Sequence, residues 1–96
     1  MTDAIAREAR LAILRALKDQ VDGRLSDLLL QRTLDVYGFR RDRDWIVTQL
    51  NKLASLGAVS LSEAGTVTIA RLERPGRDHL EERSVLQGVT RPHEVE

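Results

Sequence analysis

Residues 37–59 place the tightest restriction on how this chain can fold. Gly38 suits the left-handed end of a preceding helix, and Asp42 or Asp44 offers an acceptor or a negative charge at the start of the next one. Apolar residues then recur at three- and four-residue spacing, which is typical of one buried helix face. These residues are Ile46, Leu50, Leu53 and Ala54. With Gly57 ending the helix, the segment predicts two helices joined by a short turn.

Two helices are expected before this turn. The first begins at Thr2 or Asp3, either of which can cap it, and continues to about Lys18. Its apolar surface is broader than one packing partner requires, which indicates either a central helix with several neighbours or a helix that also forms a dimer interface. Ser26 is a good N-cap for the second helix, with Asp27 in its first turn, and that helix ends at the glycine of the turn.

Alternating residues after the third helix predict a β-hairpin. The alternation occurs over residues 59–61 and 67–69, with Gly65 at the tight position between them. The connection offers Glu63 and no basic residue, which argues against a phosphate contact at its tip. Residues 23–25 are long enough only for a very short strand.

The last third of the chain predicts one more helix and a tail. A fourth helix is expected over residues 77–85, with Pro75 suited to its first turn and Leu80 as its main apolar anchor. Residues 86–96 have no hydrophobic period and predict an extended or disordered tail. The chain is therefore expected to be mostly α with a small hairpin. The expected fold is a winged helix-turn-helix domain over residues 1–85, with a three-helix core, a two-stranded wing and a C-terminal helix.

The composition excludes several classes of protein. A chain of 96 residues with 42% hydrophobic side chains suits one small domain. The absence of cysteine excludes a disulfide scaffold, a thiolate nucleophile and Cys-ligated zinc, and it fits a cytoplasmic setting. No segment approaches the roughly 18–20 apolar residues that a membrane span requires, so no membrane partner is expected. Fifteen basic residues balance fifteen acidic ones, whereas strong nonspecific DNA binders are usually basic.

The third helix carries the residues best suited to contact DNA. Arginine and glutamine can read base edges in the major groove, whereas threonine and lysine more often reach phosphates. Arginines gather at the amino end of this helix, which is the end that enters the groove in this motif. The candidate DNA-binding residues are Arg40, Arg41, Arg43, Thr48, Gln49 and Lys52. An ordinary solvated helix face explains the same polar residues equally well. Trp45 is expected at the edge of the core, and a partly exposed ring beside the arginines is the alternative, since it can stack on a partner.

Catalytic patterns are absent. Asp78, His79 and Glu82 lie close together on the expected fourth helix, but nothing elsewhere completes the four ligands of a metal site. No serine stands at a defensible spacing from a histidine, and no glycine-rich phosphate loop occurs. We therefore expect neither an enzyme nor a bound metal or cofactor.

The order of these elements resembles a known group, the small winged-helix proteins of Mu-like bacteriophages and prophages, which are often described as related to ArsR-type regulators. The resemblance covers about residues 10–92 and rests on the segments LAILRAL, LLLQRTLDVYGFRRDRDWIVTQLNKLASLGAVSL and GVTRP. It implies a winged helix-turn-helix fold and DNA-linked or regulatory work in a phage programme. Metal sensing of the ArsR type does not carry over, because those sensors usually use cysteines. Some members of such groups serve only as protein-interaction modules.

Two functions follow from these observations. The first is a transcriptional regulator that binds double-stranded DNA, with each third helix in a major groove. Such a regulator would act as a homodimer through the first helix or the C-terminal segment. The second is a winged-helix module that binds a phage or host protein and never touches DNA. The arginines at the third helix favour the first function, whereas the neutral charge and the acidic hairpin favour the second.

Overall fold

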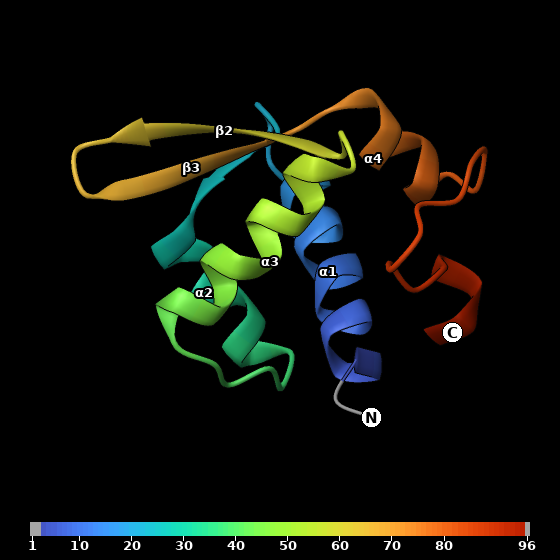
Figure 1. Cartoon of the computed structure of the whole chain (residues 1–96), viewed down its shortest axis with the longest axis horizontal. Coiled ribbons are helices and arrows are strands. Elements are labelled where there is room, and N and C mark those ends of the chain that lie inside the picture. The colour runs from blue at the N-terminus through green and yellow to red at the C-terminus, as the bar shows by residue number, and fades with distance from the viewer. Residues whose placement is uncertain (1–2, 96) are drawn as a thin grey trace.

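Three helices pack against one face of a small antiparallel sheet, and a fourth helix lies beside them (Figure 1). The computed structural model describes residues 3–95. In chain order the elements are α1 (Asp3–Lys18), β1 (Arg24–Ser26), α2 (Asp27–Val36), α3 (Arg43–Ser55), β2 (Val59–Ala64), β3 (Val67–Leu72), α4 (Arg74–Leu80) and a 3-10 turn, η1 (Pro92–Val95). The capping of α1 by Thr2 or by the Asp3 side chain lies outside the described atoms.

Helix α1 is the central element of the fold. It contacts α2, α3, α4 and β3, which explains why its apolar surface is broader than one partner requires. Four of its large side chains are almost fully buried: Leu11, Ile13, Leu14 and Leu17. No helix within residues 3–95 has both the length and the apolar character to cross a membrane.

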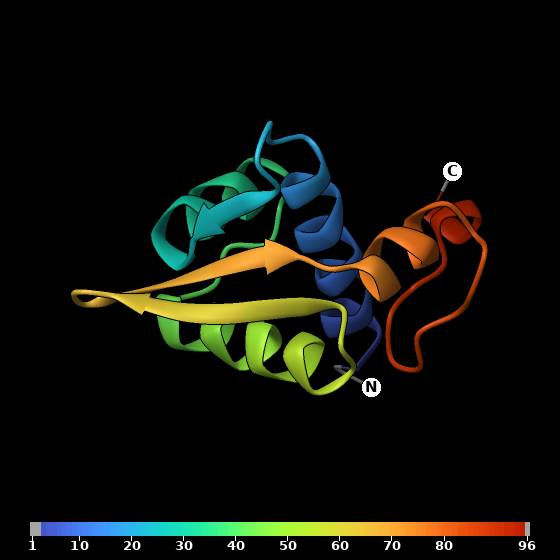
Figure 2. The same ribbon diagram turned by 90° about the horizontal axis from the view of Figure 1, so that it is seen from above.

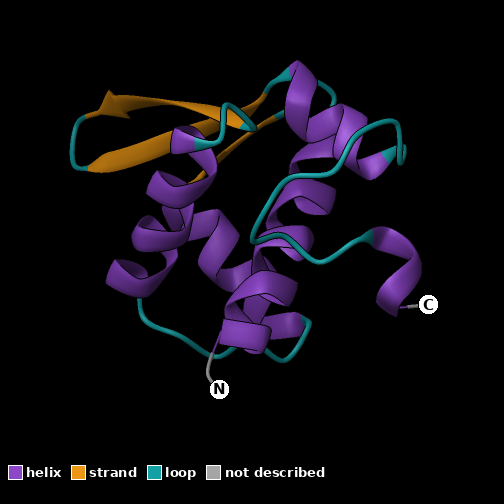
Figure 3. Cartoon of the chain, turned by 45° about the vertical axis from the view of Figure 1, so that its right-hand side comes forward, coloured by secondary structure: helices purple, strands orange, loops and turns teal. Residues whose placement is uncertain are grey.

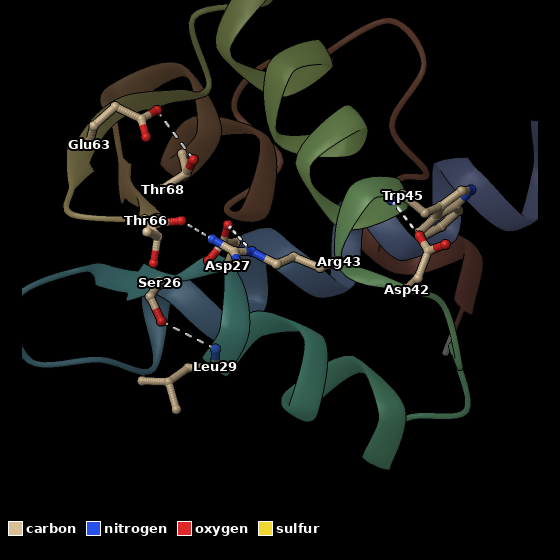
Figure 4. Close-up of polar contacts among 9 residues, drawn as sticks. All are labelled: Ser26, Asp27, Leu29, Asp42, Arg43, Trp45, Glu63, Thr66 and Thr68. Atoms are coloured by element: carbon tan, nitrogen blue, oxygen red, sulfur yellow. Dashed lines mark hydrogen bonds and ion pairs between the residues drawn. The ribbon is translucent and has the colours of Figure 1, made fainter.

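The caps and ends of α2 and α3 follow the sequence signals. The Ser26 hydroxyl accepts the main-chain N–H of Leu29 at 3.2 Å. For α3, the structure selects Asp42 as the cap, because its carboxylate accepts the N–H of Trp45 at 2.8 Å (Figure 4). Gly38, which follows α2, has the positive φ angle (96°) that a helix end favours. The predicted boundaries of this helix pair are therefore confirmed.

The sheet is larger than the predicted hairpin. Its strand order is β1-β3-β2, so the short segment at Arg24–Ser26 adds a third strand beside β3. Strands β2 and β3 pair as far as Ala64 and Val67, which leaves a two-residue turn with Gly65 in its first position. Glu63 is therefore not at the hairpin tip but within β2. The described residues form four α-helices and a three-stranded antiparallel sheet, an arrangement compatible with a winged helix.

Helix α4 differs from its prediction in position and in anchor. It spans Arg74–Leu80, three residues earlier at its start and five earlier at its end than the predicted 77–85. The helix ends at Leu80, and the positive φ angle of Glu82 (58°) shows that the main chain is no longer helical there. Leu80 is only partly buried, whereas Gly76 and His79 are buried. The glycine is required, because a Cβ there would lie 2.5 Å from the carbonyl oxygen of Ala58.

The expected C-terminal tail instead packs on α1. Residues 86–95 lie along this helix, and Val89 belongs to the hydrophobic core (Figure 3). The main-chain N–H of Thr90 donates to the carbonyl oxygen of Arg7 at 3.2 Å. The Arg10 guanidinium donates to the carbonyl oxygen of Gly88 at 2.6 Å. These contacts join segments that are about eighty residues apart, so no local sequence pattern announces them.

His79 completes this attachment from the side of α4. Its Nδ1 accepts the N–H of Leu86 at 3.0 Å, so the proton of the neutral ring is on Nε2, which donates to the carbonyl oxygen of Thr90 at 2.9 Å. Both ring nitrogens are thereby used by the main chain. This histidine fixes the C-terminal segment and has no nitrogen left to offer to a metal.

We predict that His79→Leu destabilises the protein. The substitution leaves a partly buried N–H and a partly buried carbonyl without partners, which should lower the free energy of unfolding by about 1–3 kcal/mol. His93→Leu is the comparison variant, because His93 is exposed and its contact with Glu82 lies on the surface, so its loss should cost less than about 1 kcal/mol. Urea denaturation of both variants measures the difference. Equal effects would contradict the role assigned to His79.

Candidate nucleic-acid interface

Helix α3 turns an uncovered polar face away from the core. Its apolar side chains Ile46, Leu50 and Leu53 are fully buried against the rest of the molecule. The exposed residues on the opposite side are Asp44, Thr48, Asn51, Lys52 and Ser55. This outer face carries one acidic and one basic side chain among small hydrogen-bonding groups. It can therefore donate and accept hydrogen bonds but carries no net charge of its own.

Gln49 does not belong to this outer face, although it was expected there. Its side chain is buried, with 4% exposure, and its Oε1 accepts Nε–H of Arg10 at 2.8 Å. The sequence contains the signal for this position, since Gln49 stands three residues after Ile46 and four before Leu53 on the buried stripe. The polar character of the residue concealed it. A buried glutamine satisfied by an arginine positions α3 on α1 and is closed to any ligand.

The side chain of Arg43 also forms hydrogen bonds within the protein. Its Nε donates to Oδ2 of Asp27 at 2.9 Å, and its terminal nitrogen donates to the carbonyl oxygen of Thr66 in the hairpin turn (Figure 4). The side chain of Asp27 is 1% exposed and that of Arg43 is 36% exposed. We call these three residues the Arg43 clamp. The clamp joins the start of α2, the start of α3 and the tip of the hairpin.

The clamp meets a strict electrostatic requirement of Asp27. A buried carboxylate is costly unless a charged partner and hydrogen bonds replace its water. Asp27 is in the first turn of α2, where the helix dipole favours negative charge, and Arg43 supplies the positive partner. Its other oxygen, Oδ1, has no hydrogen-bond partner. The Arg43 contact is therefore the main compensation for burying this charge.

The remaining arginines of the turn are on the surface. Arg40 pairs with Asp35 across an exposed 3.3 Å contact between Nε and Oδ1. The guanidinium of Arg41 lies over the ring of Trp45, 5.0 Å from its centroid. Trp45 is partly buried against the core, so its predicted place at the core edge is confirmed. Both arginines flank the amino end of α3.

A shallow hollow of about 350 Å³ separates this turn from α2. Three guanidinium groups, one carboxylate and one amide surround it. The lining residues are Gln31, Arg32, Asp35, Arg40 and Arg41. This excess of positive charge suits an anion such as a backbone phosphate. Arg32 is not among the residues predicted from the sequence, although it stands three residues before Asp35 and the two are therefore neighbours on the surface of α2.

These features describe a small, mostly helical domain in which the exposed helix α3 lies beside a β-hairpin. The ion pair between Asp27 and Arg43 links helices α2 and α3, and Arg43 also contacts the hairpin. The chain is 32% identical over 92 residues to uncharacterized protein gp26 of Escherichia phage Mu. The match covers 96% of this chain and 95% of the phage protein. The chain therefore belongs to the same protein family as gp26 of phage Mu, which confirms the resemblance to proteins of Mu-like phages. No protein-family model and no solved structure matches the chain.

We predict that Arg43→Met destabilises the protein by about 2–4 kcal/mol. It leaves the Asp27 carboxylate buried without its partner, and the partly exposed guanidinium keeps the cost below that of a fully buried pair. Arg40→Met removes an exposed pair of the same kind and should cost less than about 1 kcal/mol. Thermal and urea denaturation compare the two variants. Similar stabilities would show that the clamp has no special structural role.

Proposed function

We propose that this protein is a winged helix-turn-helix protein that binds double-stranded DNA through α3. One observation carries the proposal: α3 has an uncovered polar face, and the Arg43 clamp holds the hairpin beside that face as a wing. The chain order supports it, since α2, a short turn, α3 and a β-hairpin follow one another. This order is that of a helix-turn-helix with a wing.

The candidate residues divide into two groups with different tasks. On the outer face, Thr48 and Asn51 offer hydrogen bonds to base edges, and Lys52 can reach a phosphate. Asn51 enters the set here because it is exposed and because asparagine pairs well with adenine. Arg43 and Gln49 are not proposed to contact DNA. Their internal hydrogen bonds instead hold α3 in position.

The turn supplies most of the positive charge for this surface. Arg41 and the hollow beside Arg32 and Arg40 can hold backbone phosphates on one side of the groove that α3 enters. The charge is modest, because Asp35 and Asp44 lie among these residues and the whole chain is neutral. We therefore expect weak binding to random DNA and a dependence on hydrogen bonds to particular bases.

The biological setting follows as part of the proposal. The family relationship to gp26 places the chain among proteins of Mu-like phages. A transcriptional regulator of a phage or prophage is the function that a small DNA-binding winged helix would serve there. A homodimer would present two α3 helices to successive major grooves. The uncovered side of α1 at Ile5, which is 45% exposed, supports the first helix as the dimer contact.

A protein partner is the second candidate function. The outer side of α2 exposes three aliphatic residues, Leu28, Leu29 and Val36, and Tyr37 follows them with 56% exposure. Apolar residues of this size in one region are more typical of a protein contact than of a DNA contact. A module that binds through α2 would leave the polar face of α3 unused.

We predict that duplex DNA binds this protein in a salt-dependent manner. Titration with a mixed pool of short duplexes should change the fluorescence of Trp45, since that ring lies beside Arg41 at the start of α3. The change should saturate and should weaken as salt rises. No fluorescence change and no mobility shift of the duplex would favour the protein partner.

Variants then test which surface is responsible. Lys52→Ala and Arg41→Ala should each weaken binding about tenfold at low salt. Each should also lower the slope of log affinity against log salt by about one, because each removes one phosphate contact. Anisotropy of a labelled duplex is the suitable measurement, since Arg41→Ala alters the tryptophan signal itself. Arg91→Ala is the matched control, because it removes an exposed arginine from the C-terminal segment and should leave binding unchanged.

A further inference from the structure

The outer face of the sheet has a feature that the proposed α3 interface does not use. Helices pack against one face of the sheet, and none lies over the other face among the described residues (Figure 2). Ala70 and Leu72 point to the helices and are buried, so Arg71 between them points outward and is exposed. On the neighbouring strand, Arg24 is exposed too, and it stands directly opposite Arg71 in the register.

This register places two positive charges side by side. Residues directly opposite in an antiparallel pair have Cβ atoms about 4.5–5.5 Å apart, and like charges in this position are destabilising. Neither arginine forms an ion pair with another residue in the described part of the chain. The repulsion between these two arginines therefore slightly destabilises the sheet, and no ion pair within the described residues compensates it.

Two carboxylates lie near the arginine pair in the chain, but each is engaged elsewhere. Oδ1 of Asp22 accepts the main-chain N–H of Arg24 at 3.1 Å. Oε2 of Glu73 accepts the hydroxyl of Ser60 at 2.6 Å, and Ser60 is the residue opposite Arg71 on β2. Asp22 thus binds the main chain of Arg24 and Glu73 binds the hydroxyl of Ser60, while the side chains of Arg24 and Arg71 remain exposed to solvent.

We propose that Arg24 and Arg71 together bind one phosphate group. Two guanidinium forks on adjacent strands can each donate two hydrogen bonds to a tetrahedral oxyanion, and its negative charge would relieve their mutual repulsion. A single carboxylate offers fewer acceptor positions for two such forks. The site faces away from the helices, so it is separate from the α3 interface and does not rest on the proposed function. Inorganic phosphate and a nucleic-acid backbone share the required chemistry.

The test follows the side-chain Nε–H signals of the full-length protein by NMR. Sodium phosphate is added at constant pH, and sodium chloride at equal ionic strength serves as the reference. The signals of Arg24 and Arg71 should shift and saturate with phosphate only. In Arg71→Gln, the affinity measured at Arg24 should fall at least about tenfold, because one fork alone holds the anion weakly. Arg24→Gln gives the reciprocal measurement if the first variant does not fold.

Matched controls and a second titration complete the experiment. Arg91→Gln removes an exposed arginine elsewhere and should leave the phosphate response of Arg24 and Arg71 unchanged. A short DNA duplex then distinguishes the sources. Shifts of both arginines with the duplex, reversed by free phosphate, would assign the site to a nucleic-acid backbone, whereas shifts with phosphate alone would assign it to a small phosphate ligand. The proposal would be overturned if neither phosphate nor the duplex gave a saturable shift. It would also be overturned if the phosphate response of Arg24 were unchanged in Arg71→Gln.

Discussion

The ion pair between Asp27 and Arg43 is the contact on which the arrangement of the functional elements depends. Burying a carboxylate to 1% exposure is costly without a partner, and the partner comes from the start of α3. The same guanidinium reaches the carbonyl oxygen of Thr66, so one side chain fixes α2, α3 and the hairpin turn together. The hairpin extends to one side of the domain, and its β3 strand also pairs with β1 as far as Ile69 (Figure 1). The Arg43 contact therefore adds a hold at the hairpin tip to the strand pairing and helix packing that place the hairpin beside α3.

The interior of this protein uses polar residues that a surface interface would also favour. Arg43 serves the clamp, Gln49 and Arg10 join α3 to α1, and His79 holds the C-terminal segment. What remains outside is a smaller and less basic surface than the sequence suggests. A substitution at Arg43 or Gln49 therefore acts through the fold, so any loss of binding in such variants needs a stability measurement beside it.

Local signals in the sequence were enough to predict the helix pair and its ends. Ser26, Asp42 and Gly38 act through neighbouring main-chain atoms, so their roles can be recognised without tertiary structure. The outward placement of Gln49 was wrong because a polar residue on the buried stripe was taken as exposed, and the arginine that satisfies it is 39 residues away. A very short strand was expected near Arg24, but its pairing with β3 and the packing of the C-terminal segment depend on residues far along the chain and were not predicted. The hollow between α2 and the turn needed the folded chain, which brings Arg32 near Arg40 and Arg41.

In the proposed function, the Arg43 clamp presents α3 and the hairpin to DNA as one surface. The most direct test is a series of ¹H–¹⁵N NMR spectra recorded while short mixed duplexes are added to the full-length protein. We expect the main-chain signals of Thr48, Asn51 and Lys52 to shift together with those of Gly65 and Thr66. The side-chain amide of Gln49 should keep its position. Shifts confined to the exposed side of α2, or no shifts on α3, would contradict the claim.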